Sequence, residues 1–278
     1  MGYKEIIVQA GSRPADAVRM SLAADLAKRF GAALTAVQVT PPPITAYLGG
    51  LEGASFTGNS LSDLMEQQAQ EIRRESSQAQ AALAGAAGPS GVAATFKTIP
   101  GETRSAFIFL TRQADLTVLP TPAETGSNAE TPPEAIAMGS GGPVLLIHPE
   151  WNPAPIGKRI LVAWNGSREA ARAVKDAMPL LKGADQVDVL VIDADEATHD
   201  VETTLPAYLG RHGCKVQVHR VSSVDQPVGE VMLRQAGRLD SDLIVMGLYG
   251  HARLQEMVIG GASRHTLRHA RTPLFVSH

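Results

Sequence analysis

The sequence runs through one succession of segments twice, and this duplication limits the folds that are open to the chain. Residues 5–39 and 159–193 each read as an apolar strand, a Gly-Ser turn, a helical stretch and a second apolar strand. Further on, residues 99–120 match residues 226–247. A repeat of about half the chain indicates a duplicated domain rather than a solenoid of short units.

Short apolar strands alternate with amphipathic helical stretches in each half, which is typical of βαβ units. The strand at 187–192, VDVLVI, is almost wholly apolar, as expected for a parallel strand with helices over both faces of its sheet. Ser167 and Ser62 have the residue type and position of helix N-caps. We therefore predict an α/β fold of two tandem Rossmann-like domains, each an open five-stranded parallel sheet with helices on both faces.

A proline-rich segment separates the two repeats. Residues 149–157, PEWNPAPIG, contain three prolines, which stiffen the chain and are unsuited to a sheet. The sequence therefore predicts a domain at 1–149, a linker at 150–157 and a second domain at 158–278. The first half also carries an insert, Thr40 to Ser60, that is rich in proline and glycine. A surface loop is the favoured interpretation of this insert, and a lid is the alternative.

The composition is that of an ordinary globular protein. The 278 residues suit two domains, and a net charge of −3 with 4% aromatic residues argues against a nucleic-acid-binding surface. A single cysteine, Cys214, favours a reducing compartment. The first apolar run contains charges, and no uncharged apolar stretch reaches membrane-spanning length. We expect a cytoplasmic protein that binds neither nucleic acid nor membrane.

The strongest functional pattern lies near the C-terminus. From Gly247 to Ser263 the chain reads GLYGHARLQEMVIGGAS, directly after the apolar strand Leu243 to Met246. Glycines at the end of a strand allow a tight turn, and glycines before a helix bring bare N–H groups and the positive helix end toward an anion. This arrangement suits the phosphates of a nucleotide. The alternative is a plain strand-to-helix turn with a close helix–sheet contact.

With Gly247, Gly250 and Gly260 spaced in this way between the strands at 242–246 and 272–276, the chain resembles the universal stress protein family. The family pattern is Gly-x2-Gly-x9-Gly-(Ser/Thr), and its nucleotide-binding members hold ATP or a related adenine nucleotide. The resemblance covers almost the whole chain and implies two tandem domains of the HUP type. It implies a stress-response regulatory or interaction module that binds ATP, ADP or AMP, with or without Mg²⁺.

The resemblance also implies site residues in the second half. In the family, the Asp-Gly-Ser turn and the backbone at the end of the second strand contact adenine and ribose. By position these roles fall on Asn165 and Val191, with help from the backbone of Ala163. The phosphates are assigned to the N–H groups of Gly247, Gly250, Gly260 and Gly261 and to the hydroxyl of Ser263.

Two departures from the family pattern affect this site. Asn165 replaces the family's Asp and brings no negative charge. Gly261 replaces the Ser that usually follows the third glycine, which removes one hydroxyl contact of about 1 kcal/mol. Ser263 is placed to compensate for part of that contact.

The first half departs further from the pattern. Its segment Gln9-Ala10-Gly11-Ser12, aligned with the Asn165 turn, puts Ala10 in place of Asn165. Pro120 and Ala123 stand where the second half has its first two motif glycines. Because proline has no N–H to offer a phosphate, we expect the N-terminal site to be degenerate.

No motif predicts a catalytic residue. The sequence has no P-loop, nucleophile elbow or Cys-x2-Cys pair, and His265 and His269 share a helix face without a third metal ligand nearby. We expect no metal site and at most a weak ATPase. The rival hypotheses are a stress scaffold that binds no nucleotide and, less favoured, a slow ATP hydrolase.

The family resemblance also predicts how the halves meet. Related single-domain proteins dimerise through their last strands, so we expect Val144 to Ile147 and Leu274 to Ser277 to pair within one chain as a pseudo-dimer. Such pairing would remove two exposed sheet edges. A further homodimer of two chains and the identity of a protein partner stay open.

Overall fold

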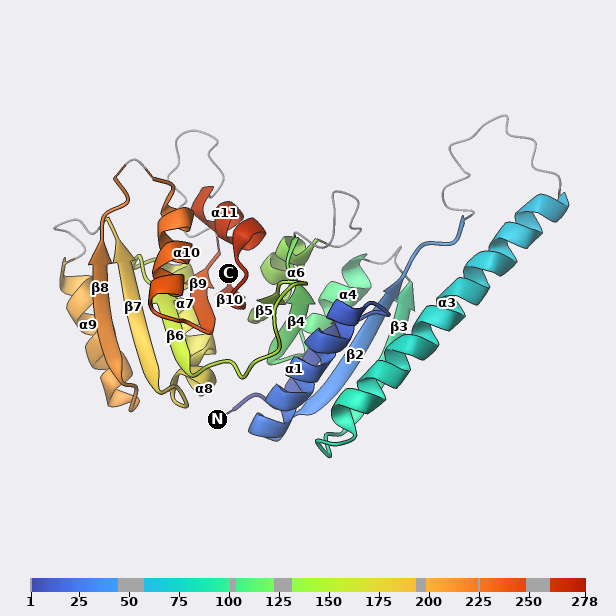
Figure 1. The fold of residues 1–278 in the computed structure, drawn as a ribbon, viewed down its shortest axis with the longest axis horizontal. Coiled ribbons are helices and arrows are strands. Elements are labelled where there is room, and N and C mark those ends of the chain that lie inside the picture. The colour runs from blue at the N-terminus through green and yellow to red at the C-terminus, as the bar shows by residue number, and fades with distance from the viewer. Residues whose placement is uncertain are drawn as a thin grey trace.

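The computed structural model describes residues 2–44, 58–100, 104–122, 132–193, 199–224, 226–248 and 261–278. Strands and helices alternate through both halves of the chain (Figure 1). The elements of the first half are β1 (Glu5–Ala10), α1 (Pro14–Phe30), β2 (Ala33–Thr40), α3 (Gly58–Ala87), β3 (Ala94–Pro100), α4 (Arg104–Thr111), β4 (Leu116–Pro120), α6 (Pro133–Gly139) and β5 (Val144–Ile147). Those of the second half are β6 (Arg159–Ala163), α7 (Arg168–Asp176), α8 (Met178–Leu181), β7 (Gln186–Ile192), α9 (His199–Arg211), β8 (Val216–Val221), α10 (Val228–Arg238), β9 (Leu243–Gly247), α11 (Gly261–His269) and β10 (Leu274–Ser277).

The strands of the described residues form one ten-stranded sheet in the order β3-β2-β1-β4-β5-β10-β9-β6-β7-β8. Each half contributes five strands that pair in parallel, so the predicted α/β fold class is confirmed. The halves join where β5 and β10 pair antiparallel, with Leu145 opposite Phe275. The predicted pairing of these two closing strands within one chain is therefore confirmed.

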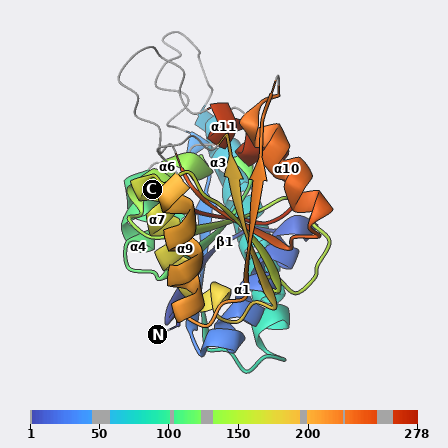
Figure 2. The same cartoon turned by 90° about the vertical axis from the view of Figure 1, so that its left-hand side faces the viewer.

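Helices cover both faces of the sheet. In the second half, α9 and α10 lie on opposite sides of the strands (Figure 2). One apolar core includes residues of α1, α7 and α9, and a second core on the other face includes residues of α4, α6, α10 and α11. Both cores contain side chains from both halves, so the apolar layers continue across the β5–β10 junction.

Of the two serines predicted to be N-caps, one caps a helix and the other lies within a helix. Ser167 caps α7, since its Oγ accepts a hydrogen bond from the N–H of Ala170 at 3.1 Å. Ser62 lies inside α3, which begins at Gly58, so the prediction of a helix start at Ser62 is wrong. Serine is tolerated on an exposed helix face, and Ser62 is exposed. Most of the insert, residues 45–57, lies outside the described residues.

An aspartate anchors the start of the first strand in each half. Asp115, just before β4, accepts hydrogen bonds from the N–H groups of Lys4 and Glu5 at 2.6 and 3.0 Å. Asp242, just before β9, accepts from the N–H groups of residues 157–159 at 2.7, 2.8 and 3.0 Å. The repeat seen in the sequence therefore extends to equivalent hydrogen bonds in the structure.

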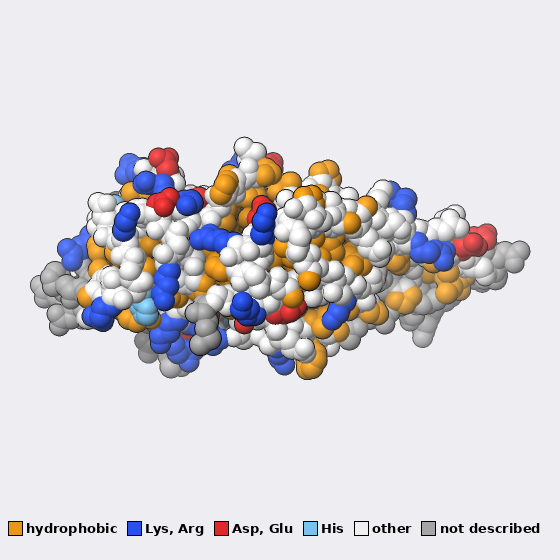
Figure 3. Space-filling view, turned by 90° about the horizontal axis from the view of Figure 1, so that it is seen from below, with side chains coloured by type: hydrophobic (Ala, Val, Ile, Leu, Met, Phe, Trp, Pro, Cys, Tyr) orange, Lys and Arg blue, Asp and Glu red, His pale blue; other side chains and the backbone are white. Residues whose placement is uncertain are grey.

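The segment between β5 and β6 runs past the C-terminal end of α1, where Arg29 donates to the carbonyl of Ile156 at 3.2 Å. Seen from below, Lys and Arg side chains are spread along the molecule with apolar side chains exposed between them (Figure 3). Within the described ranges, no helix combines the length and the apolar character that crossing a bilayer requires. The domain division at 150–157 stays a prediction.

Candidate functional site

The strand order of the second half creates one place where a ligand is expected. β6 lies between β7 and β9, so the chain first extends the sheet in one direction from β6 and later in the other. Open α/β sheets bind ligands outside the carboxyl ends of the strands at such a switch point. These strand ends and the start of α11 lie at the top of the molecule in Figure 1. Ala163 ends β6 and Gly247 ends β9, so two predicted site residues lie at this edge.

The turn after β6 is fixed by the side chain of Asn165. Its Oδ1 accepts a hydrogen bond from the N–H of Ser167 at 3.1 Å, and Gly166 between them has a φ of 71°. A carboxylate oxygen would accept the same hydrogen bond. The change from the family's Asp to Asn therefore leaves the geometry of this turn intact and removes only its charge.

Gly247 has a packing reason to be glycine. A Cβ on this residue would lie 2.5 Å from the backbone N of Ala170 and 2.5 Å from the carbonyl carbon of Glu169. The end of β9 and the first turn of α7 therefore approach so closely that no side chain fits between them. This is the helix–sheet contact that the sequence analysis kept as the alternative explanation of the glycine pattern.

Gly261 has no such reason. It is the first residue of α11, and a Cβ there would meet no atom within 4 Å among the described residues. The nine-residue helix presents its positive end at this edge of the sheet. Ser263, 8% exposed, lies in the same first turn. Gly250 and Gly260 lie outside the described residues.

At the end of β7, the backbone N–H and C=O groups of Ile192 point toward the β6 side of the sheet, and those of Val191 point toward β8. The carbonyl of Leu190 accepts from the N–H of Trp164 on the β6 side at 2.9 Å, and the N–H of Asp193 donates to Val221 of β8 at 3.0 Å. Since peptide groups alternate in direction along a strand, the N–H and C=O of Val191 point toward β8 and those of Ile192 toward β6.

The assignment of Val191 to the contact with adenine and ribose stays a prediction. The side chain of Val191 is 4% exposed and belongs to the core, and β6 has ended at the level of Ile192. Outside the strand ladders, no backbone hydrogen bond among the described residues involves Ile192. The sequence does not reveal this orientation, because the direction of a peptide group depends on which neighbouring strand it bonds.

Comparison with known proteins gives a family match for the second half of the chain. Residues 157–278, which include the Asn165 turn and the glycine segment, match the model of the universal stress protein family. This half is a universal stress protein domain. No curated protein has a significant match to the sequence.

Solved structures extend the likeness to the first half. The fold is similar to that of a universal stress protein from Archaeoglobus fulgidus DSM 4304, with a TM-score of 0.67, 15% identity, and coverage of 98% of this chain and 95% of that chain. It is also similar to a putative universal stress protein from Pseudomonas aeruginosa UCBPP-PA14, with a TM-score of 0.55, 15% identity, and coverage of 99% and 93%. Both likenesses include the N-terminal half, so that half shares the fold of the universal stress protein domain.

The register of the strands corrects the alignment of the two halves. Val8 pairs with β4 as Val162 pairs with β9, and the N-caps Arg13 and Ser167 each follow five residues later. The residue equivalent to Asn165 is therefore Gly11, and the prediction that Ala10 takes its place is wrong by one residue. The Gly-Ser pair used to align the sequences does not mark the cap in both halves.

The side chains of the N-terminal half fill the space beside this turn. A Cβ on Gly11 would collide with the carboxylate of Asp16. Asp16 forms an ion pair with Arg19, and both side chains are 2% exposed. Nε and Nη2 of Arg19 also donate to the carbonyl of Gln9, which is the counterpart of Ala163, at 3.2 and 3.1 Å. These contacts occupy groups whose counterparts in the C-terminal half are predicted to contact a ligand.

The charge of Asp16 depends on its arginine partners. Burial by itself would raise the pKa of Asp16, but the charge of Arg19 and the hydrogen bonds from Arg13 outweigh burial and hold that pKa below its usual value. Pro120 occupies the strand-end position that Gly247 has in β9, as predicted, and Ala123 lies outside the described residues.

Three other side chains of the universal stress protein domain make contacts within the fold. Trp164 packs against the core that includes α7 and α9, and its Nε1 is buried with no hydrogen-bond partner in the described chain. His265 and His269 stack with ring centroids 4.3 Å apart. Among the described residues, no group of three His, Cys, Asp or Glu side chains is placed to hold a metal ion.

Proposed function

We propose that the C-terminal universal stress protein domain binds an adenine nucleotide, ATP, ADP or AMP, at the carboxyl edge of β6, β7 and β9. The observation that carries the proposal is Gly261, which opens α11 at this edge although no contact with the described residues requires a glycine there. A bare helix start gives N–H donors and a positive dipole end that suit a phosphate. The N-terminal half is proposed to be structural.

Each part of the nucleotide has a proposed partner. The phosphates meet the N–H groups of Gly261, and by the sequence pattern those of Gly250 and Gly260, with the hydroxyl of Ser263, and Mg²⁺ would accompany a triphosphate. The ribose lies against the Asn165 turn and the backbone of Ala163. The adenine ring is read by the end of β7, where an adjacent N–H and C=O match the donor and acceptor on its edge.

The proposed activity is regulation by occupancy. A bound nucleotide shifts a conformational or partner equilibrium if it binds the two states with different affinity. We propose a stress-response regulatory or interaction module in the cytoplasm, with hydrolysis absent or slow. The partner protein is left open.

A scaffold without nucleotide is the second candidate. Gly247 is explained by its contact with α7 and Asn165 by its hydrogen bond to Ser167, so two of the site positions need no ligand to account for them. On this alternative the edge of the sheet is an interaction surface only.

Isothermal titration calorimetry with ATP and Mg²⁺ separates the two candidates. The parent chain is expected to bind, and Gly261→Val to bind at least about tenfold more weakly, a loss of about 1.4 kcal/mol, because the added side chain blocks the helix start. Gly85→Val, on an exposed part of α3 where a Cβ also meets nothing, is the matched control and should bind like the parent. A parent that releases no heat supports the scaffold, and equal binding by Gly261→Val contradicts the phosphate placement. Rapid ATP turnover would instead support an enzyme.

A further inference from the structure

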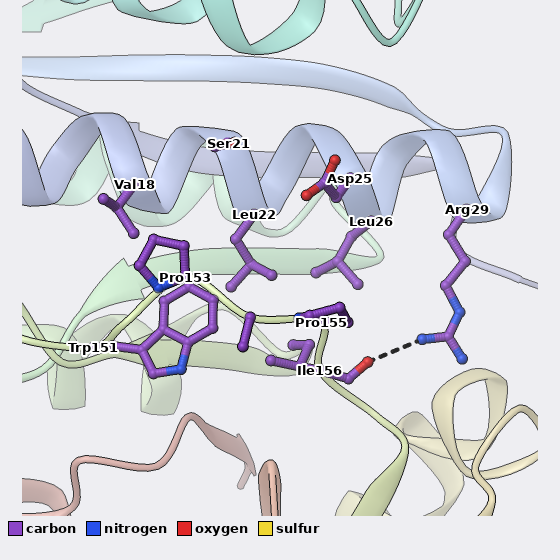
Figure 4. A pocket seen from close by; sticks show the side chains of 11 residues that line it. Val18, Ser21, Leu22, Asp25, Leu26, Arg29, Trp151, Pro153, Pro155 and Ile156 are labelled. Carbon is purple, nitrogen blue, oxygen red and sulfur yellow. Dashed lines mark hydrogen bonds between the residues drawn. The ribbon is translucent and has the colours of Figure 1, made fainter.

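A cleft of about 370 Å³ lies between α1 and the segment that joins the two halves. Figure 4 shows α1 above and the joining segment below, with their side chains meeting across the opening. The apolar walls are formed by Val18, Leu22 and Leu26 from α1 and by Trp151, Pro153 and Pro155 from the joining segment. This volume is suited to a small organic molecule rather than to a macromolecule.

The walls of the cleft are held in place by the rest of the fold. Leu22 and Leu26 are 5% and 3% exposed and belong to the core on this face of the sheet. Trp151 packs against the same core. Prolines on the opposite wall restrict the backbone of the joining segment. The cleft is therefore a preformed apolar surface.

Two charged side chains lie at the cleft, and they are not equivalent. The guanidinium of Arg29 keeps its positive charge, and its hydrogen bond to the carbonyl of Ile156 at 3.2 Å and its position 5.4 Å from the centre of the Phe30 ring hold it at the end of the cleft (Figure 4). Asp25, one helical turn before Arg29, is exposed, and no cation among the described residues comes within ion-pair distance of its carboxylate. The cleft therefore combines apolar walls with one carboxylate that has no ionic partner among the described residues.

We propose that this cleft binds a small organic cation, a protonated amine on an apolar, aromatic body. The apolar body is buried against the leucines, the prolines and the indole of Trp151, and the ammonium group pairs with Asp25 at the rim. A neutral ligand of the same shape gains only the apolar part, and an anion is repelled by Asp25. The site is separate from the nucleotide edge and does not depend on it.

The two tryptophans of the chain make this testable by NMR, because each gives one indole N–H signal. Phenethylammonium is the probe, with 2-phenylethanol as the neutral analogue and phenylacetate as the anion. We expect phenethylammonium to shift the Trp151 signal and leave that of Trp164 in place. Its affinity should exceed that of 2-phenylethanol by about tenfold, which corresponds to about 1.4 kcal/mol.

Variants of the full chain connect the binding to the cleft. Asp25→Asn keeps the shape of the side chain and should weaken phenethylammonium about tenfold without changing 2-phenylethanol. Asp63→Asn on exposed α3 is the matched control and should change neither. Ala154→Trp, at an exposed residue that lines the cleft, should fill it and abolish both. Equal affinity for the amine and the alcohol, full amine binding by Asp25→Asn, or an unmoved Trp151 signal at millimolar amine each overturns the proposal.

Discussion

At the level of single residues, Gly247 at the end of β9 has two explanations: a contact with phosphate and a tight packing contact with α7. The four glycines predicted to cradle phosphates include one whose missing side chain is required for packing, because α7 begins directly against the end of β9. Gly261 lies at the same edge, and a Cβ there would contact none of the described residues. A loss of nucleotide binding after substitution is therefore informative at 261, whereas at 247 it would be mixed with a loss of folding.

Gly247→Ala is predicted to lower the free energy of unfolding by about 2 kcal/mol, as overpacking of a tight contact typically does. The reason is the 2.5 Å distance from the new Cβ to the backbone of α7, which neither element can relieve by rotating a side chain. Urea unfolding followed by circular dichroism measures the change. Gly85→Ala, inside exposed α3 with nothing within 4 Å, should instead gain about 0.5–1 kcal/mol. Equal stabilities of the two variants would contradict the packing argument.

The buried ion pair in the N-terminal half predicts a dependence on pH. The pKa of Asp16 is lowered in the folded chain, so its contribution to stability is present above its unfolded value of 3.8 and is lost as the pH falls through the folded pKa. Asp16→Asn removes the negative charge that balances buried Arg19 and should cost about 3–5 kcal/mol at neutral pH. The difference in the free energy of unfolding between the parent and the variant should become smaller as the pH is lowered toward about 3.

Urea unfolding of both proteins across this pH range tests the sign. Glu71→Gln, which removes an exposed ion pair with Arg74 on α3, is the control and should change stability little at any pH. If the difference in the free energy of unfolding between the two proteins increases on acidification, Asp16 is not held ionised by Arg19.

At the level of elements, the sequence predicted the strands and helices that a clear pattern of apolar residues marks. The strand at 187–192 was recognised because a parallel strand covered on both faces is apolar throughout, and the structure extends it only to Gln186. Ser167 was recognised as a cap because the turn before α7 is not helical. Ser62 was misread, since α3 already continues through the residues before it, and serine alone does not distinguish a cap from an exposed helix position.

The site was predictable in part. Glycines mark the strand end and the helix start directly, and both lie where expected. The orientation of the peptide groups of Ile192 was not predictable, because it depends on hydrogen bonds to the strands on either side. The pair of Asp16 and Arg19 was missed because it follows no motif. An arginine between Val18 and Met20 on the buried side of α1 was the one signal that could have found it.

At the level of the whole molecule, the junction of β5 and β10 makes two repeats into one body. Phe275 and Leu145 face each other across it and are fully buried. Asp176 of α7 also links the halves, because its carbonyl accepts from the Tyr3 hydroxyl at 2.9 Å. Its carboxylate accepts from Ser277 at the end of β10, also at 2.9 Å. Neither half has its complete apolar core without the other.

We therefore predict that the parent chain unfolds in a single calorimetric transition, with the calorimetric and van't Hoff enthalpies equal. Phe275→Asp places a charge in the buried junction and should divide the transition into two, one for each half, because it breaks the only strand pair between them in the described sheet. Phe109→Asp, at a phenylalanine of α4 that is 60% exposed, is the matched control and should keep one transition. Two transitions in the parent would mean that the halves fold independently and that the continuous sheet adds little to their coupling.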